Sequence, residues 1–197
     1  MAEYAYKMFN KDLTCTLGKG KYQYQPGVWI EEPEANCRKN GFHCAKNPLD
    51  CLSYYPSWEN SQCWIVEIGG DIDEDSFDSK ISCTRIRLIR QLNLEEFVAE
   101  ACRYMIRFPK AAVNMIVSRE PRKGAGANGF IIVRCEEPEA CGQEGDVIGL
   151  LKENQRTGQI YAGNVFTVGT AAHRPGVWYN VFGEEVKKDA QADRTAV

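Results

Sequence analysis

The first half of the chain contains short runs in which hydrophobic and polar residues alternate. Such alternation puts every second side chain on the same face and is typical of a strand with one buried face. It predicts strands over residues 4–9, 64–68 and 81–89. The second of these strands is expected to end at Gly69 and Gly70, because glycine disfavours the interior of a strand.

A hairpin is predicted around Pro26 and Gly27. Residues 21–25 alternate in the same way, and residues 28–30 are again apolar. Proline pre-sets the first dihedral angle of a type II turn, and glycine supplies the positive φ at the next position. The two flanking runs are therefore expected to pair with each other.

One amphipathic helix is predicted from about Leu94 to Phe108. Asn93 can cap its first turn, and Glu96, three residues further on, completes a capping box. The apolar residues of the helix recur at helical spacing and form one stripe: Leu94, Phe97, Val98, Ala101, Met105 and Phe108. Pro109 is expected to end the helix, because the residue before a proline disfavours the helical conformation.

After residue 118 the chain carries short apolar runs separated by turns that contain glycine. These runs predict four strands, over residues 130–135, 147–151, 160–168 and 177–182. The residues before them are rich in glycine, alanine and charge, which predicts a flexible linker. The residues after them have little apolar surface to bury and are expected to fray.

Together these elements predict an α+β fold. A mixed sheet with one main amphipathic helix is expected first, followed by a small strand-rich C-terminal part. The domain boundaries are placed at 1–118 for the α+β domain, 119–129 for the Gly/Ala-rich linker, 130–183 for the small β-rich domain and 184–197 for the tail.

Composition indicates a folded protein of a reducing compartment. Of 197 residues, 44% are hydrophobic, so the chain can bury a core. The net charge is −3 and both halves carry both signs, so bulk charge does not support direct nucleic-acid binding. Neither a signal peptide nor an apolar run of membrane-spanning length is found. We expect a cytoplasmic protein whose nine cysteines are mostly buried free thiols.

Three motifs that could bind a metal or a dinucleotide are incomplete. Four cysteines and His43 crowd between Cys37 and Cys63, but without a Cys-x-x-Cys pair, so no zinc is expected. Residues 71–78 begin like a calcium-binding loop but lack its glycine and its final glutamate. The G-x-G-x-x-G of residues 124–129 precedes a predicted strand instead of opening a helix. No metal ligand is assigned.

A candidate binding site lies around His43. The adjacent residues Tyr54 and Tyr55 follow it at short distance along the chain. A histidine with nearby tyrosines can stack on a nucleotide-like ring and form hydrogen bonds with it. The same residues can also form a satisfied pair within the core. The sequence leaves both interpretations open.

Cations near the strand at residues 81–89 are candidate contacts for an anionic partner. Cys83, Arg85 and Arg87 share one face of this strand, which we expect to be solvated because the other face carries the apolar residues. Guanidinium groups bind carboxylate or phosphate well. Lys80, just before the strand, is the third cation of this group.

Several short motifs follow one another in the first half of the chain. They are YKMFNKDLTC at 6–15, YQY at 22–24, GFH at 41–43, PLD at 48–50, YYP at 54–56, VE at 66–67, GDI at 70–72 and SK at 79–80. In this order they resemble a domain-of-unknown-function family found in bacterial, prophage and tailed-phage proteins. The resemblance implies a shared N-terminal fold and a mobile-element context, and no known activity.

The same region is more distantly similar to the NAD-binding half of ADP-ribosyltransferases. The shared feature is the order of a strand, a Gly-aromatic-His motif, a short helix with tyrosine and an apolar strand that ends in Val-Glu. This similarity implies NAD use through Lys7, His43 and Tyr54. No Glu-x-Glu follows the later strand, where Arg85 and Arg87 stand, so no catalytic acid is identified.

We therefore expect a small intracellular recognition protein of phage or prophage type. It would bind a host macromolecule, such as a host protein or ribonucleoprotein, without catalysis or cofactor, and anti-defence activity is a candidate role. The alternative is an ADP-ribosyltransferase-like enzyme that uses NAD. A structural component of a phage particle is a third hypothesis, which the strand-rich C-terminal half favours. The oligomeric state stays open.

Overall fold

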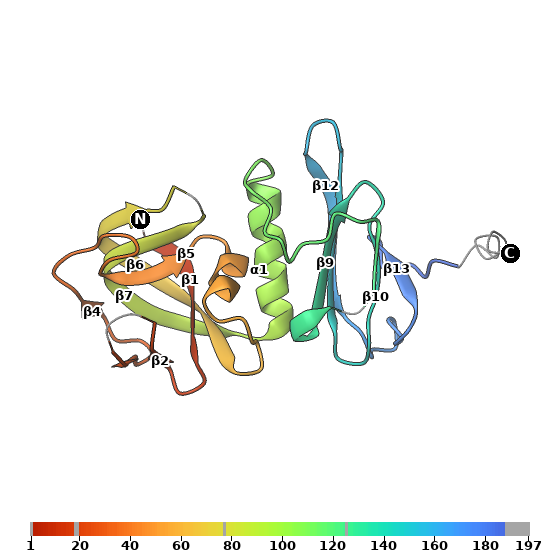
Figure 1. The fold of residues 1–197 in the computed structure, drawn as a ribbon. Coiled ribbons are helices and arrows are strands. Elements are labelled where there is room, and N and C mark those ends of the chain that lie inside the picture. Colours follow the sequence, from red (N-terminus) through yellow and green to blue (C-terminus); the bar gives the residue numbers. More distant parts are fainter. Residues whose placement is uncertain (1, 18–19, 77, 125, 188–197) are drawn as a thin grey trace, which may run out of the picture. The chain divides into compact units, whose positions relative to one another are not determined.

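A computed structural model of the chain describes residues 2–17, 20–76, 78–124 and 126–187. The chain divides into two compact units, a first unit of residues 1–116 and a second unit of residues 117–197 (Figure 1). The first unit contains α1 (Leu94–Arg107), the one α-helix of the described residues, and the second is built of strands. The predicted α+β class and the strand-rich C-terminal part are confirmed.

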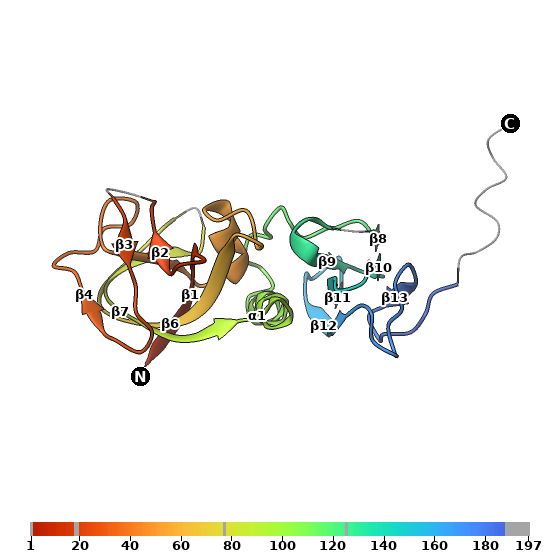
Figure 2. The same ribbon diagram turned by 90° about the horizontal axis from the view of Figure 1, so that it is seen from below.

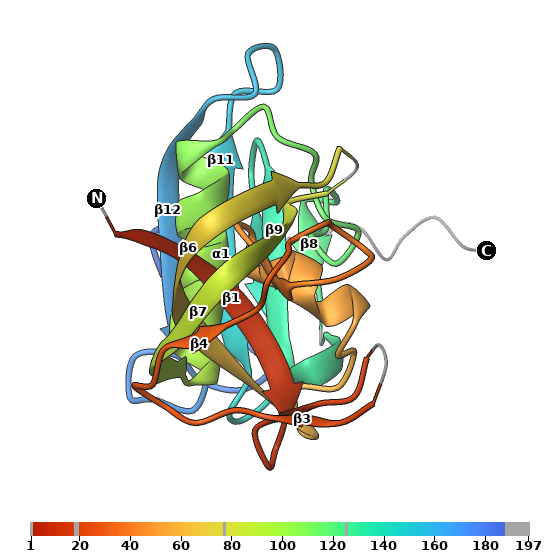
Figure 3. The ribbon, with the colours of Figure 1, turned by 90° about the vertical axis from the view of Figure 1, so that its left-hand side faces the viewer.

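The first unit is built on a sheet that closes into a ring. Its strands are β1 (Glu3–Asn10), β4 (Ile30–Glu31), β5 (Phe42–Ala45), β6 (Ser61–Glu74) and β7 (Lys80–Leu92). Their order is β4-β7-β5-β1-β6, and β6 also pairs with β7, so β1, β5, β7 and β6 form a closed ring. All strand pairs of this sheet are antiparallel, so the sheet is not mixed as predicted. Figure 3 shows β6 and β7 curving past β1.

The ring encloses a hydrophobic core. Its buried side chains are Ala5, Phe9, Tyr24, Phe42, Cys44, Val66, Ile68, Ile81, Cys83, Ile86 and Leu88. Side chains alternate between the two faces of a strand, so Lys7 shares the inner face of β1 with Ala5 and Phe9. The expectation that Cys83 lies on a solvated face is wrong. At this residue β7 pairs with both β5 and β6, and the closed ring buries it completely.

Two predicted features of the first unit are wrong. β6 does not end at Gly69 and Gly70 but continues to Glu74, because Gly70 adopts a φ of 73° and the pairing with β7 shifts register there. The hairpin around Pro26 and Gly27 does not form. Instead Gly27 N–H donates to the carbonyl oxygen of Leu88 at 2.9 Å, so pairing with β7 overrides the local turn preference.

The chain around this segment pairs with more distant strands. β3 (Tyr22–Gln23) pairs with β2 (Thr14–Cys15), and β4 pairs with β7. Figure 2 shows β2, β3 and β4 as separate short strands beside β1 and β7. The run before Pro26 therefore pairs back with residues 14–15, and the run after Gly27 pairs with β7.

α1 begins and ends where the pattern predicts. Asn93 accepts a hydrogen bond from Glu96 N–H at 2.9 Å, and the Glu96 carboxylate accepts one from Asn93 N–H at 2.9 Å, so the predicted capping box is confirmed. The Tyr6 hydroxyl donates to Glu100 on α1 at 2.8 Å. This bond ties the helix to the outer face of β1.

The second unit consists of two small sheets. Their orders are β13-β10-β8 and β12-β11-β9. The strands are β8 (Arg122–Lys123), β9 (Phe130–Cys135), β10 (Glu139–Cys141), β11 (Val147–Glu153), β12 (Ile160–Thr167) and β13 (Trp178–Asn180). β9, β11, β12 and β13 lie where strands are predicted. β8 and β10 are too short for a periodic pattern to reveal them.

The segment predicted as a linker lies within the second unit. Arg122 and Lys123 form β8, which pairs in parallel with β10, and the 3-10 turn η2 (Ala127–Gly129) follows. The boundary falls between Ile116 and Val117, because the next residues already pair with β9. Backbone pairing with β10 accounts for the difference from the predicted position.

The tail pairs with β13 over its first residues and is not frayed there. Val186 N–H donates to the carbonyl oxygen of Trp178 at 2.8 Å, and Tyr179 forms a bridge with Glu185. The remaining tail residues, 188–197, lie outside the described part. No helix in the described residues is long and apolar enough to span a membrane.

The predicted burial of most cysteines is confirmed. Six are buried: Cys44, Cys51, Cys63, Cys83, Cys102 and Cys135. Cys15, Cys37 and Cys141 are partly exposed. In the described residues no group of three or more metal-binding side chains is close enough to hold an ion.

Candidate functional site

One cavity in the first unit gathers most of the predicted site residues. Its volume is about 580 Å³, within the range of small-ligand sites, and it is lined by β1, β5, the first residue of β7 and the segments between them. Five predicted site residues line it: Lys7, His43, Tyr54, Tyr55 and Lys80. Arg85 and Arg87 are not among its lining residues. We call this cavity the β1–β5 pocket.

Lys7 lies at the buried side of the β1–β5 pocket. Its side chain comes from the inner face of β1, and the residue is only 5% exposed. Its Nζ atom donates to the carbonyl oxygen of His43 at 2.6 Å and lies 5.4 Å from the ring centroids of both Phe9 and Tyr24. Within the described residues, no carboxylate forms a salt bridge with Lys7. An ammonium has three N–H donors, so this one can donate a hydrogen bond to a further partner.

Lys80 brings a second ammonium to the same pocket. It is the first residue of β7, and its Nζ atom lies 4.0 Å from the ring centroid of Tyr54. Tyr54 ends the 3-10 helix η1 (Pro48–Ser53), which Asn47 caps at its other end. The short helix thus places an aromatic ring under the second cation.

His43 is a neutral acceptor in this site. Its pKa is lowered to about 4, first by burial and then by the charges of Lys80 and Lys7, while a hydrogen bond with the Gly41 backbone acts in the opposite direction. Its Nε2 atom accepts a hydrogen bond from Arg38 N–H at 2.8 Å. The imidazole is therefore uncharged near neutral pH and holds the loop before β5 in place.

The loop at residues 36–41 is fixed from several sides. Cys37 N–H donates to Asp73 at 2.7 Å, and the Ser82 hydroxyl donates to the carbonyl oxygen of Asn40 at 2.6 Å. Gly41 has a φ of 81°, and a Cβ atom at this position would lie 2.5 Å from the Ser82 hydroxyl. The loop needs glycine there, and its fixed shape sets Lys39 at the rim of the pocket.

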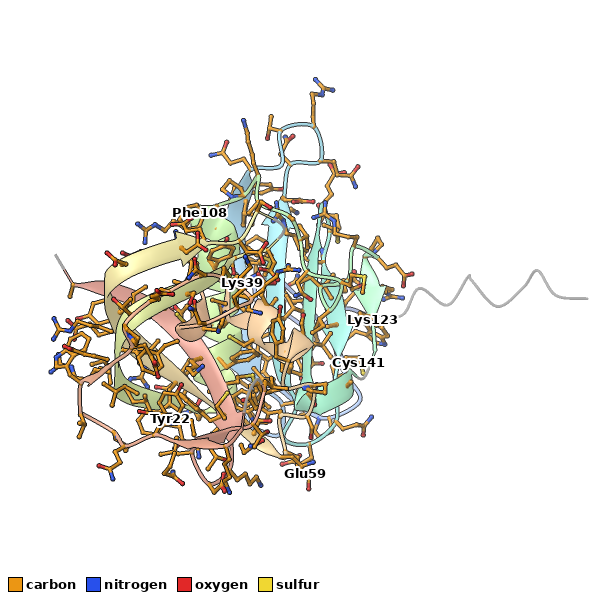
Figure 4. The ribbon with its side chains drawn as sticks, turned by 60° about the vertical axis from the view of Figure 1, so that its left-hand side comes forward. Tyr22, Lys39, Glu59, Phe108, Lys123 and Cys141 are labelled. Atoms are coloured by element: carbon orange, nitrogen blue, oxygen red, sulfur yellow. The ribbon has the colours of Figure 1, made fainter. Side chains whose placement is uncertain are left out.

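Aromatic rings lead from the buried lysine to the surface. Tyr24 is buried, and its ring centroid lies 4.8 Å from that of Tyr22, which is 41% exposed. Tyr22 and Lys39 lie apart on the first unit (Figure 4). Tyr55, by contrast, is buried, and its hydroxyl donates to the Cys15 sulfur at 3.2 Å. Tyr55 thus forms part of the pocket wall with its hydroxyl hydrogen-bonded. Tyr22 and Tyr54 have exposed rings.

The pocket is positively charged in a chain of net charge −3. Five cationic side chains line it: Lys7, Lys21, Arg38, Lys39 and Lys80. Two of them are paired within the protein, Lys21 with Asp12 at 3.0 Å and Arg38 with Asp75. Two carboxylates, Glu32 and Asp50, line it as well. Asp50 is engaged within the protein, since it accepts from the Ser79 hydroxyl at 2.7 Å and from the Asn114 amide at 2.9 Å. Three lining lysines, Lys7, Lys39 and Lys80, thus stand against two carboxylates, and this small surplus of cations favours an anionic ligand.

Arg85 and Arg87 form a separate surface cluster on β7. Arg85 pairs with Glu31 at 2.9 Å, and Arg87 pairs with Glu67. Both guanidinium groups lie over the Trp29 ring, at 4.5 and 4.9 Å from its centroid. These contacts occupy the two arginines within the protein, so they do not join the predicted site around His43.

Sequence reasoning missed several residues of the pocket. These are Tyr22, in the short strand β3, and Tyr24, Glu32 and Lys39, which lie outside the regular elements. A usable signal was the clustering of tyrosine and lysine at residues 21–24, since an aromatic-rich polar segment in a small domain is a common binding feature.

The first unit is therefore a small domain with a closed antiparallel sheet and a cationic, aromatic pocket. Residues 4–100 match the family model described as Domain of unknown function (DUF7666). The match spans β1 to the middle of α1 and includes every residue that lines the pocket. No curated protein and no solved structure matches this chain.

Proposed function

We propose that the first unit is a recognition domain that binds an anionic group in the β1–β5 pocket without catalysing a reaction on it. The observation that carries this proposal is Lys7, which is 5% exposed and has no carboxylate partner among the described residues. A buried ammonium costs several kcal/mol unless an opposite charge compensates it. An anionic ligand would supply that charge.

The titratable groups of the pocket favour binding over catalysis. His43 is neutral, and its Nε2 atom already accepts a hydrogen bond from the backbone of Arg38. Asp50 accepts hydrogen bonds from Ser79 and Asn114. A general base must have a lone pair available to the substrate. His43 and Asp50 have theirs engaged within the protein, which argues against either of them as a general base.

The partner in this proposal is a host macromolecule. The protein would act in a phage or prophage setting, with anti-defence activity as its role. The support is the order of motifs along residues 6–80, which resembles a family of bacterial, prophage and tailed-phage proteins. Capture from host lysate by the wild-type chain and by Lys7→Met tests it. A partner that both proteins retain equally contradicts binding through the pocket.

Binding of an anion is tested with a panel of phosphates in a thermal-shift assay. We expect inorganic phosphate, pyrophosphate, ribose 5-phosphate or AMP at millimolar concentration to raise the melting temperature of the wild type and of Lys11→Met. Lys11 is an exposed lysine outside the pocket and is the matched control. Lys7→Met should show no shift. Equal shifts in Lys7→Met, or no shift with any of these anions, would overturn the proposal.

A second proposal is an ADP-ribosyltransferase-like use of NAD. It is favoured by the presence of Lys7, His43 and Tyr54 in one pocket, the three residues that the distant similarity implies. Calorimetric titration with NAD tests it. Heat of binding that disappears in Tyr54→Leu, together with release of nicotinamide, would support it, and the absence of binding at millimolar NAD would remove it.

A further inference from the structure

We propose that the β1–β5 pocket takes a nucleoside monophosphate, with the phosphate at Lys7 and the base at the mouth of the pocket. The nucleotide is either free or the 5′-terminal residue of a nucleic-acid strand. This inference rests on the proposed binding of an anion and adds the class of the ligand and its orientation.

The phosphate end is set by the two ammonium groups that line the pocket. Lys7 is the more buried of the two, with its Nζ atom held by the carbonyl oxygen of His43 at 2.6 Å. Lys80, the first residue of β7, lines the same pocket. A phosphate monoester carries close to two negative charges at neutral pH, so two ammonium groups match its charge.

The base end is set by the exposed rings. Tyr24 lies 5.4 Å from the Nζ atom of Lys7, and Tyr22 follows at 4.8 Å from Tyr24. Tyr22 and Tyr54 are 41% and 37% exposed, so their rings are available to a ligand. Aromatic side chains bind bases of any sequence by stacking. The path from the buried cation to the exposed ring thus matches the order of phosphate, sugar and base along a nucleotide.

Glu32 indicates that the ligand has more than a phosphate to recognise. Its carboxylate lines the pocket, and in the described part of the chain no cation forms a salt bridge with it. A site for a bare anion would gain nothing from a carboxylate, because like charges repel. A carboxylate does suit the hydroxyl groups of a ribose, which donate hydrogen bonds to it.

The closed inner end favours a monophosphate over a dinucleotide. Next to Lys7 on the inner face of β1 lie Ala5 and Phe9, which are fully buried in the core of the ring. A dinucleotide carries its phosphates between two nucleosides and would need room for a second nucleoside beyond Lys7. The packed core occupies that position, so the phosphate must be terminal.

The test is calorimetric titration of the full chain with AMP, ribose 5-phosphate, adenosine, NAD and phosphotyrosine. We expect AMP to bind about ten-fold more tightly than ribose 5-phosphate or adenosine, as one stacked base and one bound phosphate imply. Tyr22→Ala or Tyr54→Leu should bring AMP down to the affinity of ribose 5-phosphate. Lys7→Met should bring it down to that of adenosine, and Lys11→Met should bind as the wild type does.

Each of the other outcomes overturns either this inference alone or the proposed anion binding as well. Equal binding of ribose 5-phosphate and AMP, still dependent on Lys7, would overturn this inference and leave anion recognition intact. Tighter binding of NAD or of phosphotyrosine than of AMP would also overturn it. Lack of Lys7-dependent binding by all ligands would overturn both proposals. A short oligonucleotide with a 5′-phosphate, compared with its 5′-hydroxyl form, decides whether a strand end or the free nucleotide is bound.

Discussion

The Nζ atom of Lys7 on β1 donates a hydrogen bond to the carbonyl oxygen of His43 on β5 at 2.6 Å. These two strands pair directly at Tyr6 and Ala45, so the seam between them is short. A charged side chain from the inner face of one strand thus bridges the seam. The same side chain lines the β1–β5 pocket, so one residue takes part in both the closure of the ring and the wall of the pocket.

Replacing Lys7 with methionine is expected to stabilise the fold while it abolishes binding. Methionine has a similar length and removes a buried charge that has no carboxylate partner in the described residues, so the free energy of unfolding should rise by about 1 kcal/mol. Urea unfolding of the wild type, Lys7→Met and the control Lys11→Met measures this. A loss of more than about 2 kcal/mol would mean that the bond to His43 is mainly structural.

Folding stability is expected to fall between about pH 6.5 and pH 4 through His43. Its pKa is about 4 in the folded chain, against an ordinary value of 6.5, mainly because the ring is buried. In this window the unfolded chain binds a proton that the folded chain does not, so the free energy of unfolding decreases as the pH falls. The comparison of wild type with His43→Gln isolates this effect, since the carboxylates titrate in both. Parallel pH profiles would contradict it.

Substitution of Arg85 and Arg87 is expected to leave binding to the pocket unchanged. Arg85→Ala removes a half-exposed guanidinium and should change stability by less than about 0.5 kcal/mol. Arg87→Ala leaves Glu67, 15% exposed, without its partner and should cost about 1 kcal/mol or slightly more. Loss of phosphate binding in the folded double variant would place the anion site on this face of β7 instead.

The thiols are expected to react in two groups. Burial raises the pKa of Cys51 and of Cys102 to about 12, so few of their thiols are ionised at pH 8. In the native chain at most Cys15, Cys37 and Cys141 should react rapidly with a thiol reagent. In denaturant all nine should react without reductant. A lower count there would reveal disulfides.

Limited trypsin digestion is expected to cut first at Lys110. This residue is exposed, lies between α1 and the start of the second unit, and is close to Met115, which is fully exposed. Arg122 and Lys123, in the segment that the sequence predicts as a linker, belong to a paired strand. Proteases need a locally unfolded backbone. An earlier cut after Arg122 or Lys123 would support the linker at residues 119–129.

The helix and most strands could be predicted from the sequence, because their signals are local. The capping box joins Asn93 to Glu96, three residues away, and the apolar stripe of α1 repeats every turn. β1 and β9 likewise follow from alternation or apolar runs within fewer than ten residues. His43, Tyr54 and Lys80 are predicted as candidate site residues from their types and spacing, and the structure places all three along one cavity.

Tertiary structure alone decided how the ring closes and what the pocket contains. Lys7 reaches His43 across 36 positions of sequence, and Pro26 pairs with Leu88 in place of forming a hairpin. Cys83 is buried because strands pair on both sides of it. Such contacts depend on the register between strands far apart in the chain, which local propensities do not determine. The sequence by itself determined the helix and most of the longer strands. Closure of the sheet determined that a lysine on an inner face becomes the buried cation of the β1–β5 pocket.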